Sequence, residues 1–203
     1  MIRNRVVGDI SGLPTTAFGV RSLIFWGIMG FMAIEATAFV LAAGSYLYIF
    51  GQADSWPPKP IPPPDLVYGT LFTVLLVLSE IPNRWLNRQA KAQREKPVRS
   101  GTVVMVALGL LLAVVRAFEF AHLNVRWDQN AYGSVTWLLI FLHSTHVITD
   151  LADTIVVCAW LFTHEIGGNQ FSDASDNCAY WTFVVVTWLP LYALIYWAPR
   201  VLQ

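Results

Sequence analysis

Long apolar stretches alternate with short polar connections along the chain. A helix that crosses a bilayer needs roughly 20 apolar residues, and the sequence offers five stretches of this kind. They cover about residues 22–50, 65–81, 102–123, 131–162 and 177–197. The second stretch ends at Pro82, and Pro190 marks an expected kink in the fifth, which neighbouring helices can accommodate. The pattern predicts an all-α integral membrane protein, a bundle of five transmembrane helices in a single domain over residues 1–203.

The composition agrees with this prediction. Of the 203 residues, 56% are hydrophobic and only 13% are charged, whereas a soluble domain carries about 25% charged residues. The formal net charge is zero, so nothing indicates binding to nucleic acid. Nine Trp and seven Tyr suit a protein with aromatic side chains at two membrane interfaces.

Basic residues are concentrated on one side of the predicted bundle. The connection between the second and third spans carries Arg84, Arg88, Lys91, Arg94, Lys96 and Arg99, and the segment before the first span carries Arg3, Arg5 and Arg21. The connections at the opposite side hold only Lys59 and Arg126. Because cytoplasmic loops are enriched in Lys and Arg, we expect a cytoplasmic N-terminus and a C-terminus outside. We expect no cleavable signal peptide, and reduced thiols at Cys158 and Cys178.

Ionisable residues within the apolar stretches are the candidate functional groups. Glu35 lies in the middle of the first stretch, where a charge costs roughly 2.5–3.5 kcal/mol on insertion scales. The fourth stretch carries His143 and His146, whose spacing of three places them on one helix face. Asp150 and Asp153 extend that face. The third stretch adds Arg116, Glu119 and His122.

These groups admit more than one interpretation. They can satisfy one another in a buried network that fixes helix registry. Glu119 and His122 have the spacing of half a di-iron motif, but the second Glu-x-x-His copy is absent. A bis-histidine haem is disfavoured because His143 and His146 share one face. With no P-loop, nucleophile elbow or CxxC motif, the residues suit a supporting subunit or a proton route.

Five short motifs occur in an order that resembles the subunit III family of haem–copper respiratory oxidases, in its five-helix form. The motifs are Ile34-Glu35-Ala36, then Trp56-Pro57-Pro58 with Pro62-Pro63-Pro64-Asp65, then Phe118-Glu119-Phe120, then Tyr132-Gly133-Ser134 followed by His143 and His146, and finally Tyr180-Trp181-Thr182-Phe183-Val184 with Trp188, Tyr192 and Tyr196-Trp197. The chain departs from the family pattern at Thr182, Val185 and Arg116, where the family usually has His, Asp and Gln.

The resemblance implies a non-catalytic subunit in a bacterial plasma membrane. Haem and copper would lie in partner subunits, with no cofactor in this chain. The chain would stabilise the catalytic subunit I, support proton uptake and bind phospholipid between its helices. The resemblance also implies functional roles for five buried polar residues, Glu35, Arg116, Glu119, His143 and His146. Thr182 and Val185, which replace the His and Asp of the family, put a proton-related role of the last helix in doubt. A small-residue seam, Ala42-Ala43-Gly44, could dock a partner helix.

Two alternatives stay open at this point. One is an accessory protein of a nitric oxide reductase, since the family includes such proteins. The other belongs to a different class, a free-standing di-iron membrane enzyme. Its ligands would be Glu35, Glu119, His122, His143 and His146.

Overall fold

The computed structural model describes residues 23–164 and 168–201. Five long helices account for most of them, and the described residues contain no strand. The helices are α1 (Leu23–Gln52), α2 (Leu66–Lys91), α3 (Glu95–Ala121), α4 (Ala131–Thr163) and α5 (Gly168–Tyr192), which continues into a π-helical turn η1 (Ala193–Trp197) and a short α6 (Ala198–Val201). Each long helix is apolar enough to cross a membrane. The prediction of an all-helical protein with five spanning helices is confirmed.

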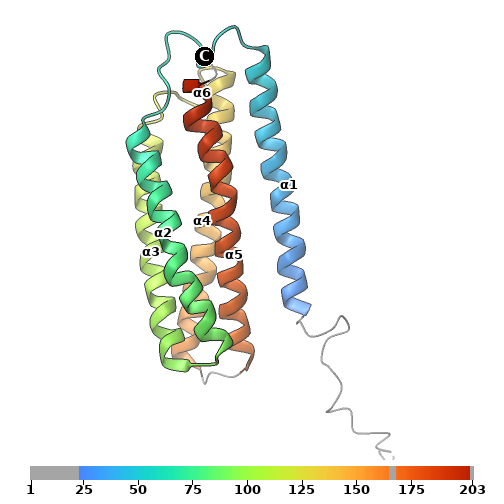
Figure 1. Cartoon of the computed structure of the whole chain (residues 1–203), viewed down its shortest axis with the longest axis vertical. Coiled ribbons are helices and arrows are strands. Elements are labelled where there is room, and N and C mark those ends of the chain that lie inside the picture. Colours follow the sequence, from blue (N-terminus) through green and yellow to red (C-terminus); the bar gives the residue numbers. More distant parts are fainter. Residues whose placement is uncertain (1–22, 165–167, 202–203) are drawn as a thin grey trace, which may run out of the picture.

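The helices run up and down in chain order (Figure 1). The start of α1, the α2–α3 turn and the end of α4 lie at one end of the bundle, and α6 lies at the other. Helices α2, α3, α4 and α5 pack into a compact group, while α1 contacts α4 and α5 along its edge. Only 11% of the apolar window of α1 is buried, against 44% of the fifth span. Helix α1 is therefore the peripheral member of the bundle.

Helix α2 differs from the expectation that its span ends at Pro82. The helix continues through Pro82 to Lys91. The residues beyond the proline pack inward, with Leu86 and Ala90 buried, and Asn83 donates a hydrogen bond from Nδ2 to the Cys178 carbonyl of α5 at 3.0 Å. A proline costs a helix one backbone hydrogen bond, and here packing against α5 offsets that loss.

The third and fifth helices begin earlier than the apolar pattern indicated. Helix α3 starts at Glu95 rather than near 102, with Pro97 in its first turn, where a missing N–H is tolerated. Helix α5 starts at Gly168 rather than near 177 and includes Pro190. The π-helical turn follows that proline. Apolar windows detect the part of a helix inside the membrane, whereas these helices continue with polar residues beyond it.

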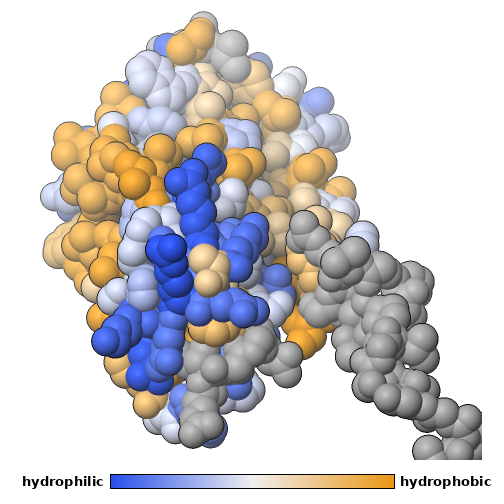
Figure 2. Space-filling view, turned by 60° about the horizontal axis from the view of Figure 1, so that its bottom comes forward, coloured by the Kyte–Doolittle hydropathy of each residue, from blue (hydrophilic) through white to orange (hydrophobic). Residues whose placement is uncertain are grey.

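The polar ends of α2 and α3 form a charged surface at the end of the bundle where α1 begins. Figure 2 shows hydrophilic residues gathered over this end, beside apolar flanks. The exposed cations here are Arg84, Arg88, Lys91, Arg94 and Lys96. Two pairs of opposite charge lie within the helices, Arg84 with Glu80 and Arg99 with Glu95, both at 2.9 Å.

Side-chain caps define where two of the helices start. Asp65 Oδ1 accepts from the Val67 N–H at 3.0 Å at the start of α2, and Asn130 Oδ1 accepts from the Gly133 N–H at 2.8 Å at the start of α4. Gly133 is required here because a Cβ at this position would lie 2.2 Å from the Arg126 carbonyl oxygen. The two free cysteines are Cys158, half-buried, and Cys178, buried.

Candidate functional site

Four buried side chains inside the bundle form what we call the arginine cluster: Arg116, Glu119, His143 and Tyr196. Arg116 Nη1 donates to Glu119 Oε2 at 2.8 Å, and the Tyr196 hydroxyl donates to Glu119 Oε1 at 2.5 Å. The side chains of Arg116 and Glu119 are 4% and 1% exposed. The cluster joins α3 to α4 and to the end of the fifth span, and it pairs a full positive charge with a full negative one.

The protonation of His143 follows from its partners. His143 Nε2 lies 3.0 Å from the Val184 carbonyl oxygen, and Nδ1 lies 3.0 Å from Arg116 Nη2. A carbonyl oxygen only accepts and a guanidinium only donates. Nε2 therefore carries the proton and Nδ1 accepts, so that His143 is a neutral imidazole beside the ion pair.

Aromatic rings enclose the guanidinium of Arg116. Its Cζ lies 3.5 Å from the centroid of the Phe72 ring and 4.0 Å from that of Trp188. Arg116 Nε has no hydrogen-bond partner in the described structure, and the two ring faces supply cation–π attraction in its place. Arginine suits this position because its planar group can stack and donate at the same time.

Tyr196 reaches the cluster because of two backbone features. It lies in the π-helical turn that follows Pro190, and its ring packs against α2 at Gly69. A Cβ at Gly69 would lie 2.3 Å from Tyr196 Cζ, so only glycine leaves room for the ring. The π-helical turn and the space at Gly69 together allow the Tyr196 hydroxyl to reach Glu119.

A second set, the glutamate cluster, consists of Glu35, His146 and Tyr180. The Tyr180 hydroxyl donates to Glu35 Oε1 at 2.8 Å, and His146 Nε2 lies 3.0 Å from the same oxygen. The cluster connects α1 to α4 and α5 and gives the peripheral helix its buried polar contact. Glu35 Oε2 has no hydrogen-bond partner in the described structure.

Glu35 and His146 share a single proton. His146 Nδ1 lies 2.6 Å from the Leu142 carbonyl oxygen, so Nδ1 carries a proton. The contact between Nε2 and Glu35 Oε1 needs one more proton, either on the imidazole or on the carboxyl group. The pair is neutral as a whole in both arrangements, and the proton can move between two atoms 3.0 Å apart.

The two clusters lie close together but are separate. Phe39 stands beside both histidines, with its ring centroid 4.7 Å from that of His146 and 6.2 Å from that of His143. The sequence predicted one polar face on α4, and the structure divides it. His143 turns to the arginine cluster and His146 to the glutamate cluster.

The rest of the predicted face on α4 forms a third polar group. Asn177 Nδ2 of α5 donates to Asp153 Oδ2 at 3.1 Å and approaches Asp150 Oδ1 at 3.5 Å. Thr154 Oγ1 donates to Asn177 Oδ1 at 3.2 Å. Asp150 is buried and its Oδ2 has no hydrogen-bond partner in the described residues. Asp153 is exposed at the surface.

Of the two residues of α5 that depart from the family pattern, Thr182 contacts α2 and Val185 is buried. Thr182 Oγ1 donates to Glu80 Oε1 at 2.9 Å, and Val185 is buried. The neighbouring Trp181 donates from Nε1 to Ser79 Oγ at 2.9 Å. Thr182 thus links α5 to α2 through a hydrogen bond.

The ligands of the di-iron alternative are not brought together. Glu35 and His146 belong to one cluster, and Glu119 and His143 to the other. His122 lies at the exposed end of α3, where Nδ1 bonds the Phe118 carbonyl at 2.8 Å. Across residues 23–164 and 168–201, no three His, Cys, Asp or Glu side chains are placed to hold a metal ion.

Sequence reasoning missed the two tyrosines and Asn177, because hydroxyl and amide groups carry no charge to mark them. For the two tyrosines, their place in the sequence motifs is a signal that could have identified them. Tyr180 and Tyr196 lie in the motifs of the fifth stretch, and buried tyrosine hydroxyls usually find a partner.

Known proteins are similar to this chain over most of its length. The family model described as cytochrome c oxidase subunit III matches residues 11–199. The cytochrome c oxidase subunit 3 of Drosophila yakuba is 25% identical over 202 residues, covering 94% of this chain and 74% of the relative. That of Paracentrotus lividus is 28% identical over 145 residues, covering 70% and 55%. The probable cytochrome c oxidase subunit 3 of Rickettsia felis is 27% identical over 187 residues, covering 88% and 65%.

Proposed function

This chain belongs to the cytochrome c oxidase subunit III family, and we propose that it is a non-catalytic subunit that stabilises the catalytic subunit of its oxidase and supports proton uptake. It is a multi-pass membrane protein and part of an oxidase complex with other subunits. The observation that carries the proposal is the family match over residues 11–199. The haem and copper chemistry would belong to the partner subunits.

The interior of the bundle supports the stabilising role. The arginine cluster fixes the register of three elements with groups that would be costly to bury unpaired. Many large apolar side chains on the outer faces of the helices stay exposed in the isolated chain. In the complex these faces would meet lipid or the helices of partner subunits. Within the seam Ala42-Ala43-Gly44, Ala42 is buried in this chain, but Gly44 is exposed and has no atom of the described residues within 4 Å of its Cβ position.

The glutamate cluster supports the proton-related role. A carboxyl group and an imidazole that share one proton can exchange it while the pair as a whole stays neutral inside the membrane. The basic end of the bundle, by the positive-inside rule, would face the cytoplasm of a bacterial plasma membrane. Phospholipid would cover the exposed apolar outer faces of α1 and its neighbours.

The test is to remove this chain from cells that make the oxidase. The oxidase without it should keep the haem spectrum and the initial rate of oxygen consumption. It should lose activity faster than the complete complex, both in mild detergent and during turnover. Re-expression of the wild-type chain should restore the slower loss.

One result would contradict the proposal. If the partner subunit is present in normal amount but its haem spectrum is lost, this chain would be needed to bind or insert the cofactor. A copurification experiment adds a second check, because the chain should purify with haem-bearing subunits in mild detergent.

A further inference from the structure

A groove of about 510 Å³ runs between α1 and the α4–α5 pair at the end of the bundle where α1 begins. We call it the acidic groove. Ile24, Ile28 and Phe31 of α1 form one wall. Asp150 and Asp153 of α4 face Asn177 and Tyr180 of α5 along the other walls. Tyr180 lines the groove and also donates to Glu35, so the groove ends beside the glutamate cluster.

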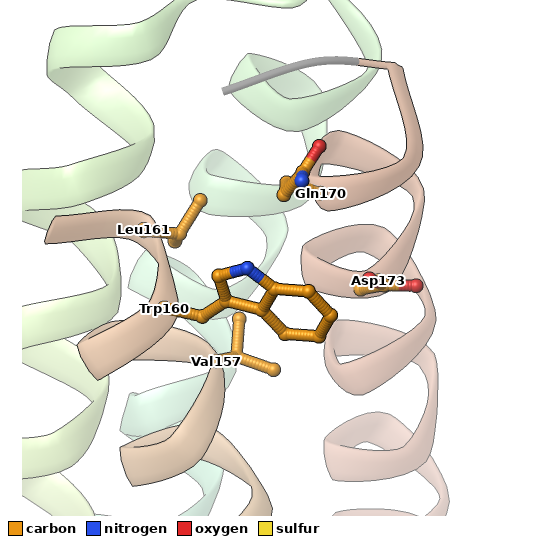
Figure 3. Close-up of a pocket in the computed structure, with 5 residues that line it drawn as sticks. All are labelled: Val157, Trp160, Leu161, Gln170 and Asp173. Carbon is orange, nitrogen blue, oxygen red and sulfur yellow. The ribbon is translucent and has the colours of Figure 1, made fainter. Parts of the chain in front are cut away.

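Figure 3 shows the outer part of this region. The Trp160 indole reaches from α4 towards α5, where Gln170 and Asp173 lie one turn apart. Trp160 and Asp173 also line the acidic groove. Tryptophan prefers the membrane–water interface, which places the mouth of the groove near water and its inner end, at Asp150 and Tyr180, deeper in the bundle.

The inner wall holds a polar atom that needs a partner. Asp150 is 1% exposed and lines the groove, and its Oδ2 has no hydrogen-bond partner in the described residues. The Asn177 amide nitrogen contacts both Asp150 and Asp153, but an amide carries no charge that could balance either carboxylate. No Lys, Arg or His is among the described residues that line the groove. Buried acidic groups of this kind demand water, a proton or a cation.

We propose that the acidic groove is a water-filled entry that brings protons from the end of the bundle where α1 begins to the Glu35–His146 pair. A volume of this size holds on the order of ten waters, and the carboxylates supply the polar partners that buried water requires. This inference rests on the proposed role in proton uptake. It adds to that role a route for the protons and a site that receives them.

The final step is a balanced proton transfer. Tyr180 of α5 contacts the pair, and Asp150 and His143 of α4 interact with it electrostatically. Glu35 is the only Asp, Glu, Lys, Arg or His of α1. When the shared proton lies on His146, a hydronium ion in the groove gives one proton to the free Oε2 of Glu35 and becomes water. The pair then holds one extra proton, which it returns through the same waters or passes on. No electron moves in this step.

Water access can be tested with engineered cysteines in the assembled oxidase, in membranes, with Cys158 and Cys178 replaced by Ser. Thr149 lines the groove, and Thr145 is exposed one turn away but does not line it. Both threonine hydroxyls bond a backbone carbonyl four residues earlier, so they are matched positions. Thr149→Cys should react with a cationic methanethiosulfonate reagent, and Thr145→Cys should stay unreactive.

The charge of the reagent adds a second readout. The carboxylates should make Thr149→Cys react at least about tenfold faster with a cationic than with an anionic methanethiosulfonate, because a charged cleft concentrates counter-ions. Asp153→Asn should reduce this preference. Asp54→Asn, at the other end of the bundle, should leave it unchanged. An unreactive Thr149→Cys would mean that an acyl chain or a partner fills the groove, and would overturn the proposal.

Proton delivery needs its own measurement. After transfer of the complex to D₂O, infrared spectra follow exchange at the pair, with the band assigned by Glu35→Gln. Asp150→Asn should slow this exchange at least about tenfold, the scale of a lost acid–base group, and Asp54→Asn should not. Unchanged exchange in Asp150→Asn would overturn the route. The haem spectrum and stability of the same complex report the proposed function separately.

Discussion

The arginine cluster and the glutamate cluster lie on either side of Phe39, yet they solve the problem of a buried carboxylate in opposite ways. Glu119 has a permanent cation, a tyrosine hydroxyl and almost no exposure. Glu35 has a histidine, a tyrosine hydroxyl and one oxygen that no described residue hydrogen-bonds, beside a groove. The first arrangement fixes every proton, and the second leaves one that can move. Carboxylates with similar tyrosine contacts can therefore serve a structural role in one place and an exchange role in another.

The largest effect is expected from breaking the fixed pair. Arg116→Leu leaves Glu119 as a buried charge without its cation, which should destabilise the protein by about 3–5 kcal/mol. Thermal unfolding of the purified complex in mild detergent measures the loss. The double variant Arg116→Leu/Glu119→Leu should lose much less than the single one, because no charge is orphaned. A single variant as stable as the wild type would show that the pair is not needed.

The sequence predicts the parts of this arrangement that depend on hydrophobicity and charge. It predicted the five helices, and it marked Glu35 as an ionisable group within the first of them, which the structure places against His146. It did not predict that α2 continues past Pro82, because that depends on packing of Leu86 and Ala90 against other helices. Nor did the spacing of His143 and His146 reveal that they serve different clusters, since a helix face is wide enough to meet two neighbours.

Breaking the other cluster should have a smaller effect. Glu35→Ala removes the acceptor of Tyr180 and the partner of His146, with an expected cost of about 1.5–3 kcal/mol for hydrogen bonds to a charged group. The damage should be concentrated on α1, because the other helices keep their contacts. Limited proteolysis of the connection between α1 and α2 reports this local loosening.

Glu35→Gln distinguishes the contribution of the hydrogen bonds to stability from that of the charge. It keeps an acceptor for Tyr180 and should recover most of the stability, while it abolishes the shared proton. If Glu35→Ala destabilises the complex as much as Arg116→Leu, the contrast between the two clusters would be wrong.

A third substitution tests the geometry of the arginine cluster without touching a charge. Gly69→Ala places a methyl group 2.3 Å from Tyr196 Cζ, and overpacking of this kind costs about 1–3 kcal/mol. The displaced ring should lose its bond to Glu119. Gly30→Ala is the matched control, since no atom of the described residues lies within 4 Å of its Cβ position. Thermal unfolding should separate the two alanine variants, and equal stability would show that Tyr196 is free to move.

The smallest effect is expected from an ion pair of the same chemistry outside the membrane-spanning segments. Arg126 binds both oxygens of Asp128, at 3.0 and 2.9 Å, but the two side chains are 70% and 40% exposed. The hydrogen bonds from Arg126 lower the pKa of Asp128 below its ordinary value. Any stability from this pair is therefore present above the pKa of the unfolded chain and is lost as the pH falls through the folded one.

That loss belongs to acid conditions, below about pH 4 for an aspartate, and water and salt screen the pair throughout. Asp128→Asn should accordingly leave the melting temperature unchanged between about pH 5 and 8, where the carboxylate is charged in both states. Melting curves of the wild type and the variant across this range provide the measurement. A large drop in Asp128→Asn at neutral pH would mean that geometry alone gives an arginine–carboxylate pair its strength. The expected absence of a drop would assign the strength of the Arg116–Glu119 pair to its burial, because the interacting groups are the same in both places.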